Sequence, residues 1–363
     1  MLRLEKRALP SRTAMLAAPF AAVAFTLVVT SLLVAWAGAP IGRAYALLLE
    51  GGFGTRFAWT ETLTRAVPLI LTGLAAAVAF KARLYNIGAE GQLYLGALAA
   101  VAVGGLHGGE GFTSVPPWLL FPLMMLAAAT AGALLLLGPA LLKSRLGVDE
   151  VVTTLLLNFI VLLFVSWMLD GPMKDPTAMG WPQSVSMQDA MQLGKLVERS
   201  RLHSGFVWAL LLSVLLWALL KYTTTGFQIR AVGANARASA FAGMPVGWVT
   251  VKVALLSGAL AGLAGAIEVA GRAGYVTLDM SPGYGYSGIV IAMLAALNPL
   301  GVVAAAIFVA GILVGADSMS RAVAVPTYIA DVIVSVSLLS MLVAAMLAQY
   351  RITWQRRSVA RAR

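Results

Sequence analysis

The chain has 363 residues, of which 60% are hydrophobic and only 11% are charged. Soluble domains carry roughly 45 to 50% apolar and about 25% charged residues. This composition therefore excludes a water-soluble globular protein and indicates a membrane-embedded chain. Cysteine is absent and only two histidines occur, which excludes disulfides and thiolate metal sites. The net charge of +11 has to be interpreted from where the basic residues lie.

Apolar runs in chain order predict ten membrane-spanning segments. The first, 14–37, is too long for the apolar core of a signal peptide, so we expect an uncleaved helix. The other runs lie at about 66–81, 86–105, 118–142, 151–169, 205–220, 251–271, 286–297, 302–316 and 327–348. The prediction is an all-α, polytopic transmembrane helix bundle over 14–348, flanked by basic segments at 1–13 and 349–363.

The basic residues predict the orientation of this bundle. With the N-terminus in the cytoplasm, alternating connections place 17 of the 26 Lys and Arg residues on the cytoplasmic side, as the positive-inside bias requires. Both termini are then cytoplasmic, and the long connections 38–65 and 170–204 are external. The charge thus favours contact with anionic lipid headgroups. Nucleic acid is not an expected partner, because no basic run alternates with aromatic residues.

Two apolar stretches are interrupted in a similar way. Residues 68–80 precede a glycine-broken polar stretch at 85–92, and residues 253–270 precede another at 271–285. The first unit begins outside and the second inside. Paired, interrupted segments of opposite orientation are typical of inverted-repeat transporters with sites at the interruptions, although chance resemblance in composition is the alternative.

The first interruption contains the motif LYNIGAEGQLYLGA, from Leu84 to Ala97. Asn86, Glu90 and Tyr94 are spaced by four, so on a helix they would share one face. A carboxylate such as Glu90 is costly in hydrocarbon and should face a cavity, a partner or water. Glu90 and its neighbour Gln92 are therefore candidates for lining a path, and an interhelical hydrogen-bonding cluster is the alternative.

The segment GVDEVVTTLLLNFI, from Gly147 to Ile160, begins the fifth expected span. Asp149 and Glu150 lie at its start, where a helix N-terminus favours negative charge. Asn158 lies two turns further along the helix. It is a candidate either for lining a path or for holding helices together.

The second interruption follows SGALAGLAGAIEVAG, from Ser257 to Gly271, whose small residues permit close helix packing. Glu268 is a further candidate for lining a path, with an interfacial carboxylate as the alternative. Tyr284, Tyr286 and Ser287 follow at an expected outer boundary, where an aromatic belt is the alternative to a role in transport.

The cytoplasmic connection 221–250 contains GFQIRAVGANARASAFAGM. Asn235 can cap a short helix over 236–242, which Gly243 and Pro245 would end. Such a short helix is marginal in water. Lipid headgroups or a cytoplasmic partner could hold it, and spacing alone leaves both open.

The chain has no GxxxxGK[ST] phosphate loop and no HExxH motif. We therefore predict no ATP site of this type, no catalytic residues and neither a metal site nor a cofactor.

Taken in order, LYNIGAEGQ, GVDEVVTTLLLN, GANARASAFAGM and SGALAGLAGAIEVAG resemble the permease subunits of bacterial ABC importers for simple sugars and nucleosides. The resemblance covers about 60–347 and is strongest to the larger permease of nucleoside uptake systems. Tyr85 and Asp149 depart from the family pattern, which more often has Phe and Asn or His there. The resemblance implies a bacterial inner-membrane protein.

The resemblance also implies partners and residue roles. A separate ATPase, with two fused nucleotide-binding domains, would supply energy. It would receive the loop containing Gly233, Asn235, Arg237 and Phe241. A smaller homologous permease and an external binding protein or lipoprotein would complete the system.

We expect inward transport of a nucleoside or a related ribose-containing solute, along a path lined by polar residues of the interruptions and of the fifth span. The candidates are Asn86, Glu90, Gln92, Asn158, Glu268 and Tyr286. A simple-sugar importer is the first alternative. The second is an ion-coupled secondary transporter in which Glu90 or Glu268 carries a proton.

Overall fold

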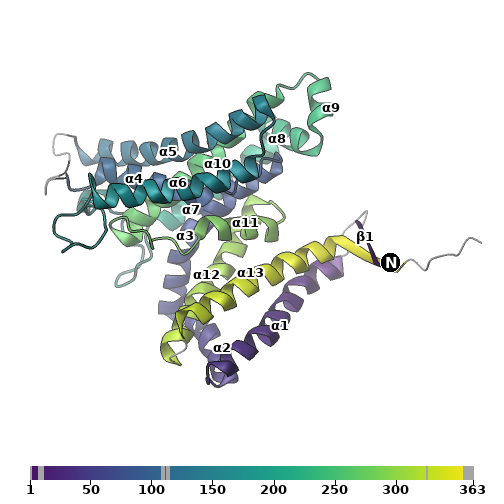
Figure 1. Ribbon diagram of the computed structural model, residues 1–363, viewed down its shortest axis with the longest axis horizontal. Coiled ribbons are helices and arrows are strands. Elements are labelled where there is room, and N and C mark those ends of the chain that lie inside the picture. Colours follow the sequence, from purple (N-terminus) through teal and green to yellow (C-terminus); the bar gives the residue numbers. More distant parts are fainter. Residues whose placement is uncertain (1, 7–11, 108–110, 112–114, 324–325, 355–363) are drawn as a thin grey trace, which may run out of the picture. The chain divides into compact units, whose positions relative to one another are not determined.

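A computed structural model describes residues 2–6, 12–107, 111, 115–323 and 326–354 (Figure 1). The chain divides into two compact units, and each is described by itself. Unit 1 comprises residues 1–51 and 315–363, and unit 2 comprises residues 52–314. Within the expected flanking segments, residues 7–11 and 355–363 lie outside the described residues.

Unit 1 is built around two helices that lie side by side, α1 (Arg12–Trp36) and α13 (Thr327–Gln349) (Figure 1). It also contains α2 (Ile41–Leu49) and a two-stranded antiparallel sheet of β1 (Leu2–Lys6) and β2 (Tyr350–Trp354), in which Leu2 pairs with Trp354. The sequence analysis predicted neither strand. The strands pair because the antiparallel arrangement of α1 and α13 brings the start of one helix to the end of the other, so that the adjoining backbones meet.

Unit 2 contains most of the remaining helices. They are α3 (Arg56–Lys81), α4 (Ala89–Gly104), α5 (Pro117–Leu146), α6 (Glu150–Asp170), η3 (Asp189–Met191), α7 (Gly205–Tyr222), α8 (Thr224–Ala234), α9 (Ala236–Phe241), α10 (Val246–Glu268), η4 (Val269–Ala273) and α11 (Tyr284–Leu294). The division between the units falls within η1 (Glu50–Gly54) and within α12 (Pro299–Ala322).

Six helices of the described part are long and apolar enough to cross a membrane: α3, α5, α6, α7, α12 and α10 continued through η4. The other four predicted runs coincide with shorter apolar helices at 24–36, 89–104, 284–294 and 331–344. The prediction of a helical membrane bundle is therefore confirmed, and its ten spans stay a prediction. The boundaries also differ, since α3 starts ten residues before the expected 66. Its polar first turns are tolerated because Thr60, Thr62 and Thr64 all donate hydrogen bonds to backbone carbonyls.

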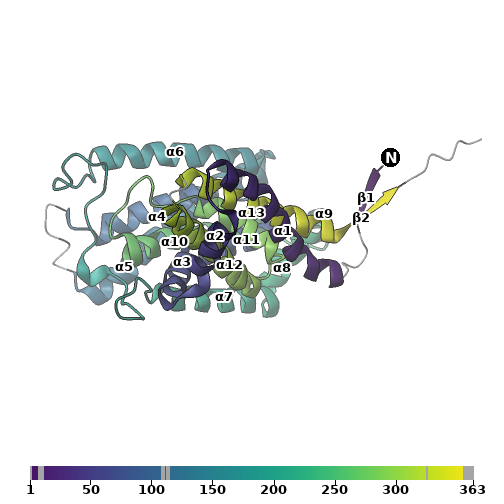
Figure 2. The ribbon, with the colours of Figure 1, turned by 90° about the horizontal axis from the view of Figure 1, so that it is seen from below.

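The core of unit 2 forms around α10, which packs against α3, α4 and α5. Figure 2 shows α6 and α7 along opposite edges of this unit. Glycines allow the central helices to approach closely. A Cβ atom added at Gly132 of α5 would overlap the carbonyl oxygen of Gly258, and one added at Gly96 of α4 would overlap that of Gly262. The close packing predicted for the glycine-rich segment of α10 is thus confirmed.

The two interrupted segments meet inside unit 2. With 16 and 11 residues, α4 and α11 are about 24 and 17 Å long, which is less than the roughly 30 Å of a hydrocarbon core. A Cβ atom added at Gly285, at the start of α11, would overlap the backbone of Glu90, at the start of α4. The starts of the two short helices are therefore in backbone contact, and the expected outer boundary at the start of α11 stays a prediction.

Candidate functional site

The polar residues of the first interruption form a closed hydrogen-bonded cluster. Asn86 Nδ2 donates to Gln92 Oε1 at 2.9 Å and to Ser257 Oγ of α10 at 3.1 Å, and Gln92 Nε2 donates back to Asn86 Oδ1 at 2.9 Å. All three side chains are buried. Asn86 precedes α4, so the expectation that it shares a helix face with Glu90 and Tyr94 is wrong. The turn at 82–88 takes Asn86 off the helix. There its side-chain oxygen Oδ1 accepts a hydrogen bond from Gly88 N.

Glu90 joins the two interruptions. Its carboxylate accepts a hydrogen bond from the backbone N–H of Gly285 at 2.6 Å, and the hydroxyl of Ser281 also bonds to it. Tyr94, one turn further along α4, donates to the carbonyl of Leu278 at 2.6 Å and accepts from Ser281 N at 3.2 Å. The buried carboxylate is therefore satisfied by backbone and hydroxyl donors of the segment that leads into α11.

Asn158 of α6 connects the same two segments. Its Oδ1 accepts from Gly91 N at 2.9 Å, and its Nδ2 donates to the carbonyl of Ile87 at 2.9 Å and to the hydroxyl of Tyr286 at 3.1 Å. Asn158 is fully buried, whereas Tyr286 is 39% exposed. Of the five clustered candidates, Asn86, Glu90, Gln92, Asn158 and Tyr286, only Tyr286 thus presents a sizeable surface.

Glu268 lies apart from this cluster, at the end of α10. It is fully buried and pairs with Arg272, one turn further along in η4. Arg272 also donates to the carbonyl of Met280 at 3.2 Å. The carboxylate is therefore surrounded by protein, and both its role in lining a path and its place at a membrane interface stay predictions. The second carboxylate oxygen of Glu268 has no hydrogen-bond partner among the described residues.

Sequence reasoning missed three contributors to these contacts. Ser257 was treated only as a small packing residue, yet it accepts from Asn86 and donates to the carbonyl of Ala75 at 2.8 Å. Arg272 could have been found, because it follows Glu268 at the spacing of a helical ion pair. Lys143 pairs with Glu150, which also accepts from Tyr85 N at 3.1 Å. Residue spacing in the sequence gave no signal for the contact between Glu150 and Tyr85.

At the start of α6, one of the two acids caps the helix. Asp149 Oδ1 accepts from Val151 N at 2.8 Å, as expected of a residue that precedes a helix. Glu150 instead ties the helix to the end of α5 through Lys143.

The short helix α9 forms as predicted. Asn235 Oδ1 caps it by accepting from Ala238 N at 3.1 Å, and Gly243, with φ of 82°, ends the turn that follows. Gly233, at the end of α8, lies so close to Lys81 that an added Cβ atom would overlap its carbonyl oxygen. Arg237 and Phe241 are exposed, Phe241 to 97%. The end of α3 thus anchors α9, which protrudes from unit 2 (Figure 1). This helix carries an exposed aromatic side chain and an exposed cation.

The opposite end of unit 2 carries the connection between α6 and α7. His203 lies in this connection, with its ring between Gly205 and Gly271, where Cβ atoms would overlap it. Gly205 N donates to Nδ1 at 3.2 Å, so the proton of the neutral ring is on Nε2, which has no partner among the described residues. Burial, and then the charge of Arg272, lowers the pKa of His203 to about 4. The imidazole is therefore neutral at pH 7.

Comparison with known proteins identifies the family of this chain. Residues 58–348 match the family described as the permease component of branched-chain amino acid transport systems. The chain belongs to this family. The permease is accordingly a multi-pass membrane protein and a transport component rather than an enzyme.

Three curated relatives are similar over most of their length. The permease is 35% identical to the guanosine ABC transporter permease NupP of Bacillus subtilis over 90% of this chain and 93% of the relative. It is 37% identical to the glucose ABC transporter permease TsgB13 of Haloferax volcanii over 85% and 82%. It is 30% identical to the nucleoside ABC transporter permease NupB of Lactococcus lactis over 76% and 77%.

Proposed function

We propose that this chain is the permease subunit of an ATP-binding cassette importer that moves a nucleoside or a related ribose-containing solute across the bacterial inner membrane. The carrying observation is the 35% identity to the guanosine permease over 90% of the chain. The similarity to the nucleoside permease supports the same solute class. The similarity to the glucose permease favours a simple sugar as the second candidate.

Uptake by the reconstituted importer distinguishes these two solutes. The permease, placed in liposomes with its ATPase, second permease and external binding protein, should accumulate labelled guanosine when ATP is supplied. Labelled glucose, assayed in parallel, should not accumulate. Glucose uptake without guanosine uptake would show that the solute is a sugar and not a nucleoside. Uptake by this chain alone under a pH gradient would show that the protein is an ion-coupled transporter and not an importer subunit.

The helix α9 is proposed as the element that couples transport to the ATPase. Phe241 and Arg237 are both exposed, and aromatic residues and arginine are enriched at interfaces with partners. Asn235 fixes the start of the helix, and Gly233 holds the end of α8 to α3. A partner that pushes on α9 would therefore move α3 through backbone contact.

A substitution that introduces a negative charge on α9 tests this coupling. Phe241→Glu should leave the bundle folded, because the side chain is exposed, but should reduce solute-stimulated ATP hydrolysis and uptake together. Tyr222→Glu is a matched control, because Tyr222 is an aromatic residue that is 68% exposed on a neighbouring helix. Unchanged coupling in Phe241→Glu would remove α9 from the mechanism.

The solute path is proposed to pass the place where the two interruptions meet. Tyr286 supplies the exposed surface there, and an aromatic ring can stack on a base or on the apolar face of a sugar. Asn158 orients the tyrosine hydroxyl. Asn86, Glu90 and Gln92 support this surface from behind, and Glu268 holds the segment that leads to it.

The membrane topology and the partners are also proposed from the family resemblance. Ten crossings, an inverted repeat and cytoplasmic termini are proposed, with a paired smaller permease, an external binding protein and an ATPase with two fused nucleotide-binding domains. Two observations support the repeat: α3 packs against α11, and α10 packs against α4. Each long helix of one interrupted pair thus contacts the short helix of the other.

A further inference from the structure

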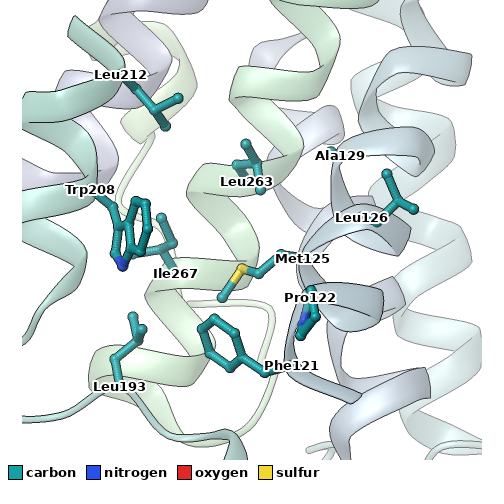
Figure 3. Close-up of a pocket in the computed structure, with 10 residues that line it drawn as sticks. All are labelled: Phe121, Pro122, Met125, Leu126, Ala129, Leu193, Trp208, Leu212, Leu263 and Ile267. Carbon is teal, nitrogen blue, oxygen red and sulfur yellow. The ribbon is translucent and has the colours of Figure 1, made fainter. Parts of the chain in front are cut away.

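An apolar groove runs along unit 2 between α5 and α7, with α10 as its floor (Figure 3). Its volume is about 570 Å³. The walls and floor include Phe121, Met125, Trp208, Leu212, Leu263 and Ile267. The groove forms because α5 packs on α10 whereas α7 packs on α3 and α8, which leaves the space between α5 and α7 open.

The chemistry of the groove excludes a polar solute. All the side chains that line it are apolar, apart from the indole N–H of Trp208. All three of its helices are long and apolar enough to cross a membrane, so the groove opens towards hydrocarbon. Its occupant should therefore be a molecule of the membrane.

The size of the groove favours an extended chain over a helix. Its α5 wall runs from Phe121 to Ala129, about 12 Å along the helix axis. A helix that crosses the membrane is about 10 Å across and about 30 Å long, so a groove with a wall of this length would cover less than half of it. A neighbouring helix could insert side chains but not its body, whereas an acyl chain has no such width.

One end of the groove has the features of a membrane interface. Leu193 closes this end, and its backbone N–H donates to the carbonyl of Ala270 at 2.8 Å. In Figure 3 the indole nitrogen of Trp208 points towards the end at which Leu193 lies. No hydrogen bond is formed by this N–H within the described part of the chain. Tryptophan adopts such positions where its ring lies in hydrocarbon and its N–H reaches the headgroups.

Positive charge follows Leu193 directly in the chain. Lys195, two residues after Leu193, is exposed and forms no ion pair with any described residue. Arg199 is also exposed, whereas Arg201 pairs with Glu61 at 4.0 Å, and Glu198 is the only acid between Lys195 and Arg201. The surplus of positive charge complements an anionic phosphate at the mouth of a groove that suits a hydrocarbon tail.

We propose that this groove binds one acyl chain of an anionic phospholipid, with the headgroup phosphate at Lys195. Burial of methylenes against α10 stabilises the tail, and Lys195 selects the headgroup. The site is independent of the transported solute, because it lies on the membrane-facing side of α5, α7 and α10 and shares no residue with the polar cluster around Glu90.

Native mass spectrometry of the purified full chain, with phosphatidylglycerol or phosphatidylcholine added at equal concentration, tests the site. The unmodified chain should retain phosphatidylglycerol about fivefold better than phosphatidylcholine, the preference expected of one lysine at an anionic headgroup. Lys195→Gln should abolish this preference. Lys174→Gln, which removes an exposed lysine of the same connection, should leave it unchanged.

Substitutions that fill the groove with a larger side chain test whether it binds the acyl chain. Ala129→Trp should abolish retention of both lipids, whereas Leu134→Trp, at an exposed position of α5 outside the groove, should not. Leu212→Trp fills the same groove from α7 and replaces Ala129→Trp if that variant does not fold. Equal retention by groove-filled and control variants would overturn the proposal. So would loss of the second permease from the assembled importer in the groove-filled variants without loss of lipid, which would identify a helix contact.

Discussion

Buried polar residues of unit 2 act through a few short contacts, and Glu268 is the clearest case. Its charge is fully buried and is balanced by Arg272, whose guanidinium also binds the carbonyl of Met280. Removing one partner of a buried pair leaves the other uncompensated, whereas removing both avoids that penalty. Through the hydrogen bond from Arg272 to Met280, the pair also holds the segment before α11.

A double-mutant cycle measures this contact. Glu268→Gln and Arg272→Gln should each lower the free energy of unfolding by about 3 kcal/mol, and the double variant should lose less than the sum. Unfolding of the purified chain by denaturant in detergent supplies the values. Additive losses would show that the two side chains do not interact.

His203 predicts a pH dependence of stability. Its folded pKa of about 4 lies below the ordinary value of 6.5, so the unfolded chain binds the proton more tightly. The contribution is fully present above pH 6.5 and is lost as the pH falls towards 4. We expect the melting temperature to be lower at pH 5.0 than at pH 7.5, from a loss of about 2 kcal/mol. His203→Gln should reduce this difference, and an unchanged difference would contradict the assignment.

At the scale of elements, backbone contact at glycines determines how α5 packs on α10. Gly132 and Gly138 lie on the same helix, but an added Cβ atom would overlap the backbone of α10 only at Gly132, since Gly138 has nothing within 4 Å. The two positions therefore form a matched pair. They separate the effect of packing from that of helix propensity.

Valine at each position tests this packing. Gly132→Val should lower the free energy of unfolding by at least about 2 kcal/mol, because the backbone must move to accept the side chain. Gly138→Val should change it little. Thermal unfolding of both variants, followed by the loss of monodisperse protein, gives the comparison. Equal melting temperatures would mean that α5 and α10 do not pack as described.

At the scale of the whole molecule, orientation in the membrane is directly testable because the chain contains no cysteine. Single cysteines at Met179, in the connection between α6 and α7, and at Tyr222, at the end of α7, would both be exposed. A membrane-impermeant maleimide added to intact cells should label Met179→Cys and should reach Tyr222→Cys only after permeabilisation. The reverse pattern would invert the proposed orientation.

The sequence by itself determined the class of structure and several local features. Apolar runs predicted the helices because crossing hydrocarbon requires a long apolar segment whatever its neighbours. The cap at Asn235 and the place of Asp149 at a helix start were readable because both depend on residues within one turn. The order of four motifs indicated the family, and the match over residues 58–348 confirmed it.

The tertiary structure decided how the polar residues are used. Asn86, Glu90 and Asn158 bind partners that are 67 to 195 residues away in the chain, and no local spacing encodes such pairs. The same holds for the strands of unit 1, which exist only because α1 and α13 bring distant backbones together. Glu268 was a candidate for lining a path, with an interfacial carboxylate as the alternative. Its complete burial depends on the packing around the end of α10, which local spacing does not encode.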